Sequence, residues 1–148
     1  MAYATNNDLL KYIPTIFDHG VEDFTDELAL AEGDVKRHIE INWYNKTFGT
    51  AYDQFGKRVG NEFDETKLVD AQWQRATVYR ALSHYILPQL ASWRPEGDVF
   101  TEQLKHYRNR YEEEISAEMA KGVQYDFDDD GIISLDERFK TRQDRLYR

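Results

Sequence analysis

The chain has 148 residues, of which 41% are apolar, so it is long and apolar enough for one folded domain with a hydrophobic core. It contains no cysteine, which excludes disulfides and thiolate metal sites. The formal charge of −9 argues against a body that grips nucleic acid, because phosphate contacts need Lys and Arg on the binding face.

The N-terminal third of the chain predicts two helices. Asn6 or Asn7 can cap a short first helix, which Pro14 interrupts. Apolar residues then recur at helical spacing and predict an amphipathic helix from Thr25 to Lys46. Gly33 marks a place where this helix can bend or split, because glycine weakens a helix interior by roughly 1 kcal/mol relative to alanine.

The middle of the chain predicts a loop and two further helices. Phe48 to Phe63 has no clear period, so we expect a long ordered loop that is suited to partner contacts. Asp64 is predicted to cap a third helix, which Pro88 kinks or ends. Asp98 is predicted to cap a fourth helix, which ends at Gly122. The fold class that follows is all-α, a compact bundle of about four helices.

No stretch has the pattern of a targeting or membrane segment. The N-terminus lacks a basic segment followed by an apolar one, and no apolar run approaches the roughly 20 residues of a membrane span. We therefore expect a soluble protein, made inside a cell, with no membrane partner. Aromatic residues make up 14% of the chain, more than a small core needs, which indicates surfaces for other proteins.

The stretch DFDDDGIISLDE, from Asp126 to Glu137, matches the twelve-residue calcium-loop pattern at every side-chain position. A hard cation such as Ca2+ is bound by six to eight oxygens, and alternate carboxylates in a turning backbone converge on one point. Gly131 stands at position 6, where the loop needs backbone angles that a residue with a Cβ adopts only at a steric cost. The predicted ligands, with Ile132 acting through its backbone carbonyl, are Asp126, Asp128, Asp130, Ile132, Ser134 and Glu137.

Two metal-free alternatives stay open for this loop. Asp and Gly are common in exposed turns, and SLDE is a capping box in which Glu137 bonds the backbone amide of Ser134 instead of a metal. The guanidinium groups of Arg138 and Arg142 offer a second way to separate the crowded carboxylates.

We expect the C-terminal segment, residues 123–148, to form an arm beside a helical body of residues 1–122. Val123 to Tyr125 and Ile132-Ile133 flank the acidic loop and predict a tiny two-stranded ribbon, and Ser134 starts a last short helix. The extended piece interrupts the entry into the loop, and the chain holds one such loop. We therefore expect this loop to bind calcium with micromolar to millimolar affinity and to act as a structural clip, a closed loop that holds the local chain in place. We do not expect a calcium sensor, which would need two paired loops.

No catalytic constellation is visible. The four histidines, at positions 19, 38, 84 and 106, fall in no metal-binding spacing. Ser83 and His84 are adjacent, which places their side chains on different helix faces and predicts no nucleophile–base pair. A phosphate-cradling glycine loop is also absent. We therefore expect a protein that is not an enzyme.

Three stretches carry a resemblance to a known family. They are the opening AYATNNDLLKYIP, the helix DELALAEGDVKRHIEINWY, and the acidic loop followed by RFKTRQDRLYR. Together they resemble head-tail connector proteins of tailed bacteriophages, the adaptor or head-completion proteins that sit under the portal. The resemblance implies a structural virion protein of the neck, at the head-tail interface, that is made in the bacterial host cytoplasm.

The resemblance also implies partners. It implies a homo-oligomer, a dodecameric ring that joins the portal to the next neck or tail-completion protein, with DNA only as passing cargo. An acidic body would suit such a ring, because like charge repels the phosphates. The basic C-terminal arm is implied to dock on the portal, through Arg138, Phe139, Lys140, Arg142, Arg145, Leu146, Tyr147 and Arg148. The competing class is a single-loop calcium-binding interaction or regulatory module.

Overall fold

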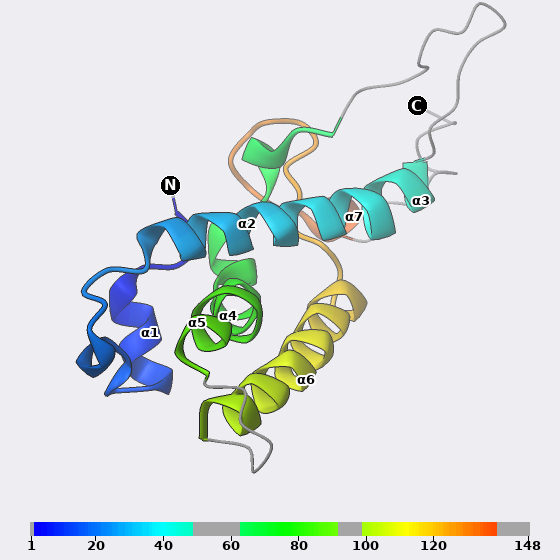
Figure 1. The fold of residues 1–148 in the computed structure, drawn as a ribbon. Helices are drawn as coiled ribbons and strands as arrows, with labels where there is room; N and C mark the ends of the chain where they lie inside the picture. The colour runs from blue at the N-terminus through cyan, green and yellow to red at the C-terminus, as the bar shows by residue number, and fades with distance from the viewer. Residues whose placement is uncertain (1, 49–62, 92–98, 139–148) are drawn as a thin grey trace, which may run out of the picture. The chain divides into compact units, whose positions relative to one another are not determined.

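The computed structural model describes residues 2–48, 63–91 and 99–138 (Figure 1). These ranges are mostly helical and contain no strand, which confirms the predicted all-α class. No helix within them is both long and apolar enough to cross a bilayer. The loop predicted between residues 48 and 63, the cap predicted at Asp98 and the arm beyond residue 138 lie outside the described residues.

Contacts within the chain group it into two compact units. The first unit comprises Met1–Val35 and Asp70–Glu118, and the second comprises Lys36–Val69 and Met119–Arg148. The acidic loop therefore groups with residues 36–69. The predicted division at residue 122 placed those residues in the helical body, apart from the loop.

Helix α1 (Asn6–Tyr12) starts one or two residues earlier than predicted, because its cap is Thr5. The backbone amide of Thr5 donates to the Asp8 carboxylate at 2.8 Å, and the Thr5 hydroxyl donates to the same oxygen at 3.0 Å. Asn6 has another role: its side-chain oxygen accepts the amide of Phe24 at 3.0 Å. The prediction of Asn6 or Asn7 as the cap was wrong because neighbouring polar residues compete for the same position.

The second helical segment runs without a break from residue 25 to residue 48. It consists of α2 (Thr25–Ile39), a π-helical turn (Glu40–Tyr44) and α3 (Asn45–Phe48), which confirms the predicted helix. The chain stays helical through Gly33, and the irregularity lies in the π turn instead.

The third segment begins later than predicted. Asp64 caps only a 3-10 turn (Glu65–Lys67), in which its Oδ1 accepts the Thr66 amide at 3.0 Å. Helix α4 starts at Asp70 and ends at Ala81, followed by a π turn (Leu82–Ile86) and α5 (Leu87–Leu90). Pro88 comes shortly after the π turn, and the helical segment continues past it to Leu90, so the proline does not end the segment.

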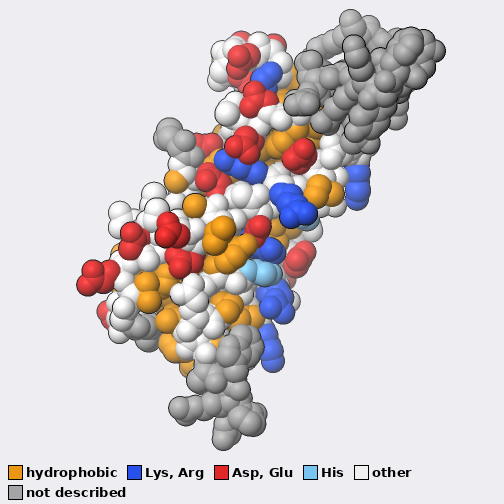
Figure 2. Space-filling view, turned by 45° about the horizontal axis from the view of Figure 1, so that its top comes forward, with side chains coloured by type: hydrophobic (Ala, Val, Ile, Leu, Met, Phe, Trp, Pro, Cys, Tyr) orange, Lys and Arg blue, Asp and Glu red, His pale blue; other side chains and the backbone are white. Residues whose placement is uncertain are grey.

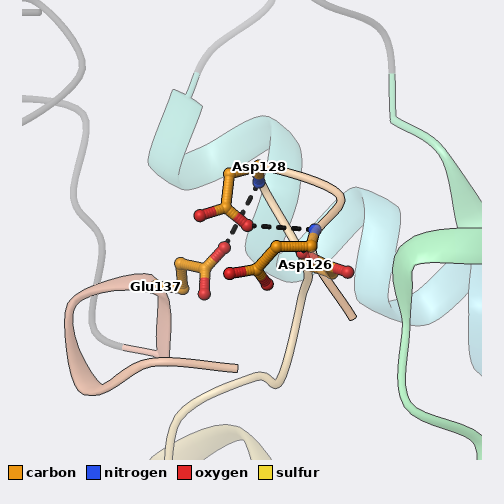
Figure 3. Close-up of side chains that lie close together, drawn as sticks. Asp126, Asp128 and Glu137 are labelled. Atoms are coloured by element: carbon orange, nitrogen blue, oxygen red, sulfur yellow. Dashed lines mark hydrogen bonds between the residues drawn. The ribbon is translucent and has the colours of Figure 1, made fainter. Parts of the chain in front are cut away.

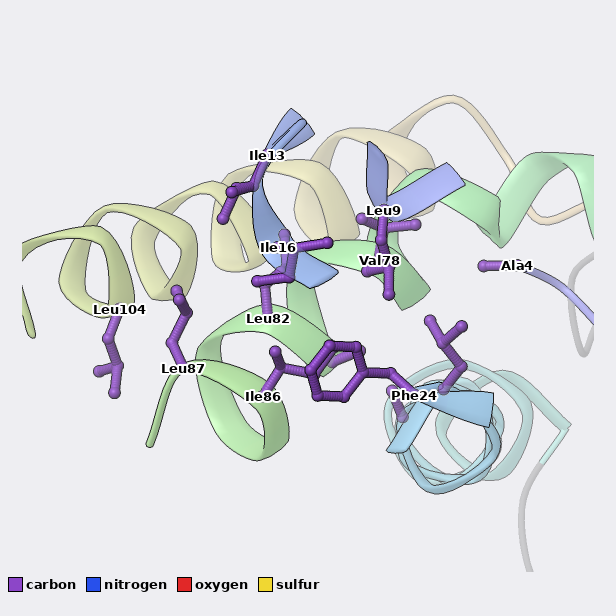
Figure 4. Close-up of a cluster of buried hydrophobic side chains, with 13 residues drawn as sticks. Ala4, Leu9, Ile13, Ile16, Phe24, Val78, Leu82, Ile86, Leu87 and Leu104 are labelled. Atoms are coloured by element: carbon purple, nitrogen blue, oxygen red, sulfur yellow. The ribbon is translucent and has the colours of Figure 1, made fainter. Parts of the chain in front are cut away.

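The core of the first unit is built from α1, α2, α4, α5 and α6 (Val99–Ala120). Phe24 and Leu9 are fully buried in it, and each such side chain contributes about 1.5–3 kcal/mol by leaving water. Figure 4 shows these side chains converging from the different helices. The labelled members are Ala4, Leu9, Ile13, Ile16, Phe24, Val78, Leu82, Ile86, Leu87 and Leu104.

Candidate metal centre

The entry into the acidic loop is fixed by backbone pairing within the second unit. Gly122 takes a positive φ of 95° and ends the fourth helix as predicted. Tyr125 then forms an isolated antiparallel bridge with Leu68. The amide of Asp126 donates to the carbonyl of Lys67 at 3.0 Å, directly beside this bridge.

This bridge corrects the predicted ribbon between Val123–Tyr125 and Ile132-Ile133. The described partner of Tyr125 is Leu68, which is only 5% exposed, whereas Ile132 is 69% exposed. A buried partner from elsewhere in the chain stabilises the bridge more than an exposed one on the near side of the loop does, because pairing is favoured where side chains pack.

An aromatic cluster supports the same entry point. The ring of Tyr125 lies 4.7 Å from that of Phe127, 5.7 Å from Trp43 and 5.9 Å from both Tyr44 and Phe63, measured between centroids. The hydroxyl of Tyr125 accepts the amide of Asp64 at 3.0 Å. Part of the aromatic surplus that the sequence assigned to partner surfaces is therefore used to hold the loop.

Inside the loop, the aspartates accept hydrogen bonds from backbone amides. Asp126 accepts the amides of Asp130 at 3.2 Å and Gly131 at 2.8 Å. Asp130 in turn accepts the amide of Ile132 at 2.8 Å. Gly131 takes the predicted positive φ, 80°, and Asp129 also has a positive φ of 62°, a conformation that aspartate tolerates better than most residues.

Glu137 closes the loop from its far end, in the short helix α7 (Leu135–Arg138). It is only 5% exposed. One carboxylate oxygen accepts the amides of Phe127 at 2.9 Å and Asp128 at 3.3 Å, and the other accepts the amide of Ser134 at 2.9 Å and its hydroxyl at 3.1 Å. The capping box predicted as an alternative is thus present, and it also ties the end of the loop to its beginning.

Four of the six predicted ligands come together. Asp126, Asp128, Asp130 and Glu137 each offer a carboxylate oxygen, and these four atoms lie within 4.8 Å of one another. Figure 3 shows three of these side chains, Asp126, Asp128 and Glu137, gathered at one place. Oxygens bound to one Ca2+ at 2.3–2.6 Å are at most about 4.6–5.2 Å apart, so the spacing suits an ion of that size. The cluster could therefore bind a metal ion.

The carboxylates differ in their affinity for protons. Burial, together with hydrogen bonds shared with Asp126 and Asp130, raises the pKa of Asp128, although the amide of Asp130 acts in the opposite direction. Burial also raises the pKa of Glu137, but the hydrogen bonds from Ser134, Asp128 and Phe127 outweigh it and the net shift is downward. Glu137 is thus held ionised, while the aspartates crowd one another.

The remaining predicted site residues are placed less fully. Ser134 contributes its hydroxyl to Glu137, and Ile132 follows Gly131 in the turn. The side chain of Arg138, one of the two guanidinium groups considered as substitutes for a metal, lies outside the described residues, as does Arg142. The partner-binding residues beyond position 138 also lie outside them.

The first unit contains a second polar cluster, which was not predicted from the sequence. Ser83 Oγ lies 2.6 Å from His84 Nδ1, which corrects the prediction that adjacent positions keep the two side chains apart. The π turn that contains both residues reduces the rotation between consecutive side chains. Arg80 Nη1 lies 3.1 Å from His84 Nε2, and Arg80 Nε donates to Asp34 at 3.0 Å.

This arrangement fixes the histidine tautomer. Because a guanidinium only donates, His84 Nε2 must be the acceptor and Nδ1 carries the proton. Nδ1 therefore donates to Ser83 and is not placed to remove the serine's proton. Burial, with Arg80 and Arg108 nearby, lowers the pKa of His84, which favours this neutral form.

Comparison with family models, with curated proteins and with solved structures gave no significant match to the chain.

Proposed function

We propose that this chain is a structural adaptor of the head-tail connector type. It assembles as a ring, joins the portal of a tailed bacteriophage to the next neck or tail protein, and docks on the portal through its C-terminal arm. The support for this class is the resemblance of the opening segment, the helical stretch at residues 26–44 and the acidic loop with its basic end.

The structural observation that supports the proposal is the closure of the acidic loop by Glu137. That side chain accepts hydrogen bonds from Phe127 and Asp128 at the start of the loop and from Ser134 near its end. Glu137 itself directly precedes Arg138, the first residue of the basic end of the arm. The start of the loop is itself anchored by the bridge between Tyr125 and Leu68. A closed loop of this kind fixes the position and direction of the chain at the end of the loop, which is the property that a docking arm needs.

Within this proposal the cation is Ca2+. Its ligands are the carboxylates of Asp126, Asp128, Asp130 and Glu137, with the Ile132 carbonyl and the Ser134 hydroxyl completing an all-oxygen set. Bound calcium neutralises carboxylates that otherwise repel one another, and so it stiffens the clip.

The experiment is native mass spectrometry and electron microscopy of the full chain, alone and mixed with the portal protein from the same phage. We expect ring-shaped assemblies, or recruitment of the chain to the portal ring. A chain that stays monomeric at high concentration and does not bind the portal would refute the adaptor.

The second candidate is a calcium-binding interaction module, which is favoured by the four converging carboxylates alone. It predicts a monomer or dimer whose size or partner binding changes between calcium and a chelator. The adaptor predicts an assembly whose existence does not depend on calcium, because the loop only directs the arm.

A further inference from the structure

The first unit carries an acidic surface near its N-terminus. From residue 12 to residue 35 the sequence contains seven Asp or Glu residues and no Lys or Arg. Asp34 and Glu32 bond within the unit, to Arg80 and to the amide of Tyr3. Others point to solvent, and we define the acidic surface by three of them that form no ion pair with another described residue: Asp18, Glu22 and Asp26.

The same unit carries a basic surface on the first half of α6. Residues 103–111 contain Lys105, His106, Arg108 and Arg110 and no acid, which is unusual in a chain with a net charge of −9. Arg110 lies over the ring of Tyr79 and pairs with Glu113 at 3.5 Å. Lys105 and Arg108 are exposed and pair with no acid in the described ranges, and these two define the basic surface.

The two surfaces lie on different sides of the first unit. Helix α4 contacts α1 through Tyr12 and Tyr79, and contacts α6 through Tyr79 and Tyr107. In Figure 1 the segment that leads into α2 and the helix α6 lie on opposite sides of α4 and α5. In the lower part of Figure 2, acidic side chains gather on the left and basic ones on the right, and further acidic side chains lie in the upper part.

We propose that the acidic surface of one copy docks on the basic surface of the next copy of this chain. Two complementary surfaces on different sides of one molecule give a head-to-tail contact, which repeats and closes into a ring when the rotation between copies allows it. Complementary charge fixes the register of such contacts and speeds their formation. The inference rests on the proposed assembly, for which it supplies the contact between copies.

Two oppositely reversed variants test this contact. Asp18→Lys with Glu22→Lys makes both surfaces basic, whereas Lys105→Glu with Arg108→Glu makes both acidic. All four side chains are exposed, so the helices should keep their circular dichroism and melting temperature. By sedimentation velocity, we expect each variant alone to associate at least about tenfold more weakly than wild type, because two exposed pairs become repulsive.

An equimolar mixture of the two variants is the decisive test. Alternating copies meet once through native charges and once through exchanged charges, so the equimolar mixture should regain assemblies of wild-type mass. Raising the salt concentration should weaken both wild type and mixture. The matched control for the first variant, Glu65→Lys with Glu113→Lys, raises the net charge by the same amount at other exposed sites and should assemble like wild type.

Variants that assemble alone like wild type would overturn this contact and leave the adaptor standing. A mixture that stops at a closed dimer would overturn the head-to-tail geometry. Wild type that neither assembles nor binds the portal would instead refute the proposed function itself.

Discussion

Replacing Glu137 by Gln separates the capping role of this residue from metal binding. Glutamine keeps one acceptor oxygen and turns the other into a donor, so one pair of hydrogen bonds is lost, either to Phe127 and Asp128 or to Ser134. Hydrogen bonds to a charged acceptor contribute about 1.5–3 kcal/mol. Since 1.4 kcal/mol is a factor of ten, the affected amides should exchange with solvent about 10- to 150-fold faster.

The assay is amide hydrogen exchange by NMR in the presence of a chelator, read at Phe127, Asp128 and Ser134. Because hydrogen bonds hold the pKa of Glu137 below its ordinary value of 4.5, wild-type protection should be complete above that pH and lost as the pH falls through the folded pKa. The variant should lack this acid transition. Glu113→Gln, on the exposed face of α6, is the control. Unchanged protection at all three amides would refute the clip.

Three further predictions follow from the loop, the arm and the histidine cluster. Calorimetry should detect calcium uptake at micromolar to millimolar concentration, and Asp128→Ala with Glu137→Gln should abolish it; no uptake by wild type would leave the loop a capped turn. Deleting residues 139–148 should leave the helical circular dichroism unchanged but abolish portal binding, and retained binding would show that the arm is not the anchor. The lowered pKa of His84 means that its neutral form stabilises the fold fully above about pH 6.5, and that this contribution is lost as the pH falls through the folded value. In urea titrations between pH 7 and 5 the free energy of unfolding should therefore fall for wild type and fall less for His84→Gln, and equal slopes would contradict this reading.

The long helices could be predicted because their signal is local and repeated. The segment from Thr25 to Lys46 shows helical spacing over several turns, and a single unfavourable residue, Gly33, does not outweigh it. The end of the helix at Gly122 was equally predictable, because glycine adopts a positive φ more readily than any other residue.

The errors arose where a distant partner decides the local conformation. Asp64 is a suitable helix cap, and it does cap a 3-10 turn. Leu68, however, pairs with Tyr125 in an extended bridge, so the α-helix begins only at Asp70. The bridge depends on residues that are close in space and far apart in sequence. The contact between Ser83 and His84 escaped prediction for a different reason, since nothing in the sequence announces a π turn.

The acidic loop combines the two roles that the sequence presented as alternatives. Each carboxylate oxygen of Glu137 already accepts two hydrogen bonds, which use both of its lone pairs, yet one of these oxygens lies within 4.8 Å of an oxygen of each of the three aspartates. Bidentate binding of an ion by Glu137 must nevertheless compete with the amides of Phe127, Asp128 and Ser134. An ion that takes the oxygens of Glu137 must displace these hydrogen bonds, and their free energy is subtracted from the affinity for the ion. The capping box therefore favours weak binding, and it makes the ion a modulator of the stiffness of the clip instead of the cause of its shape.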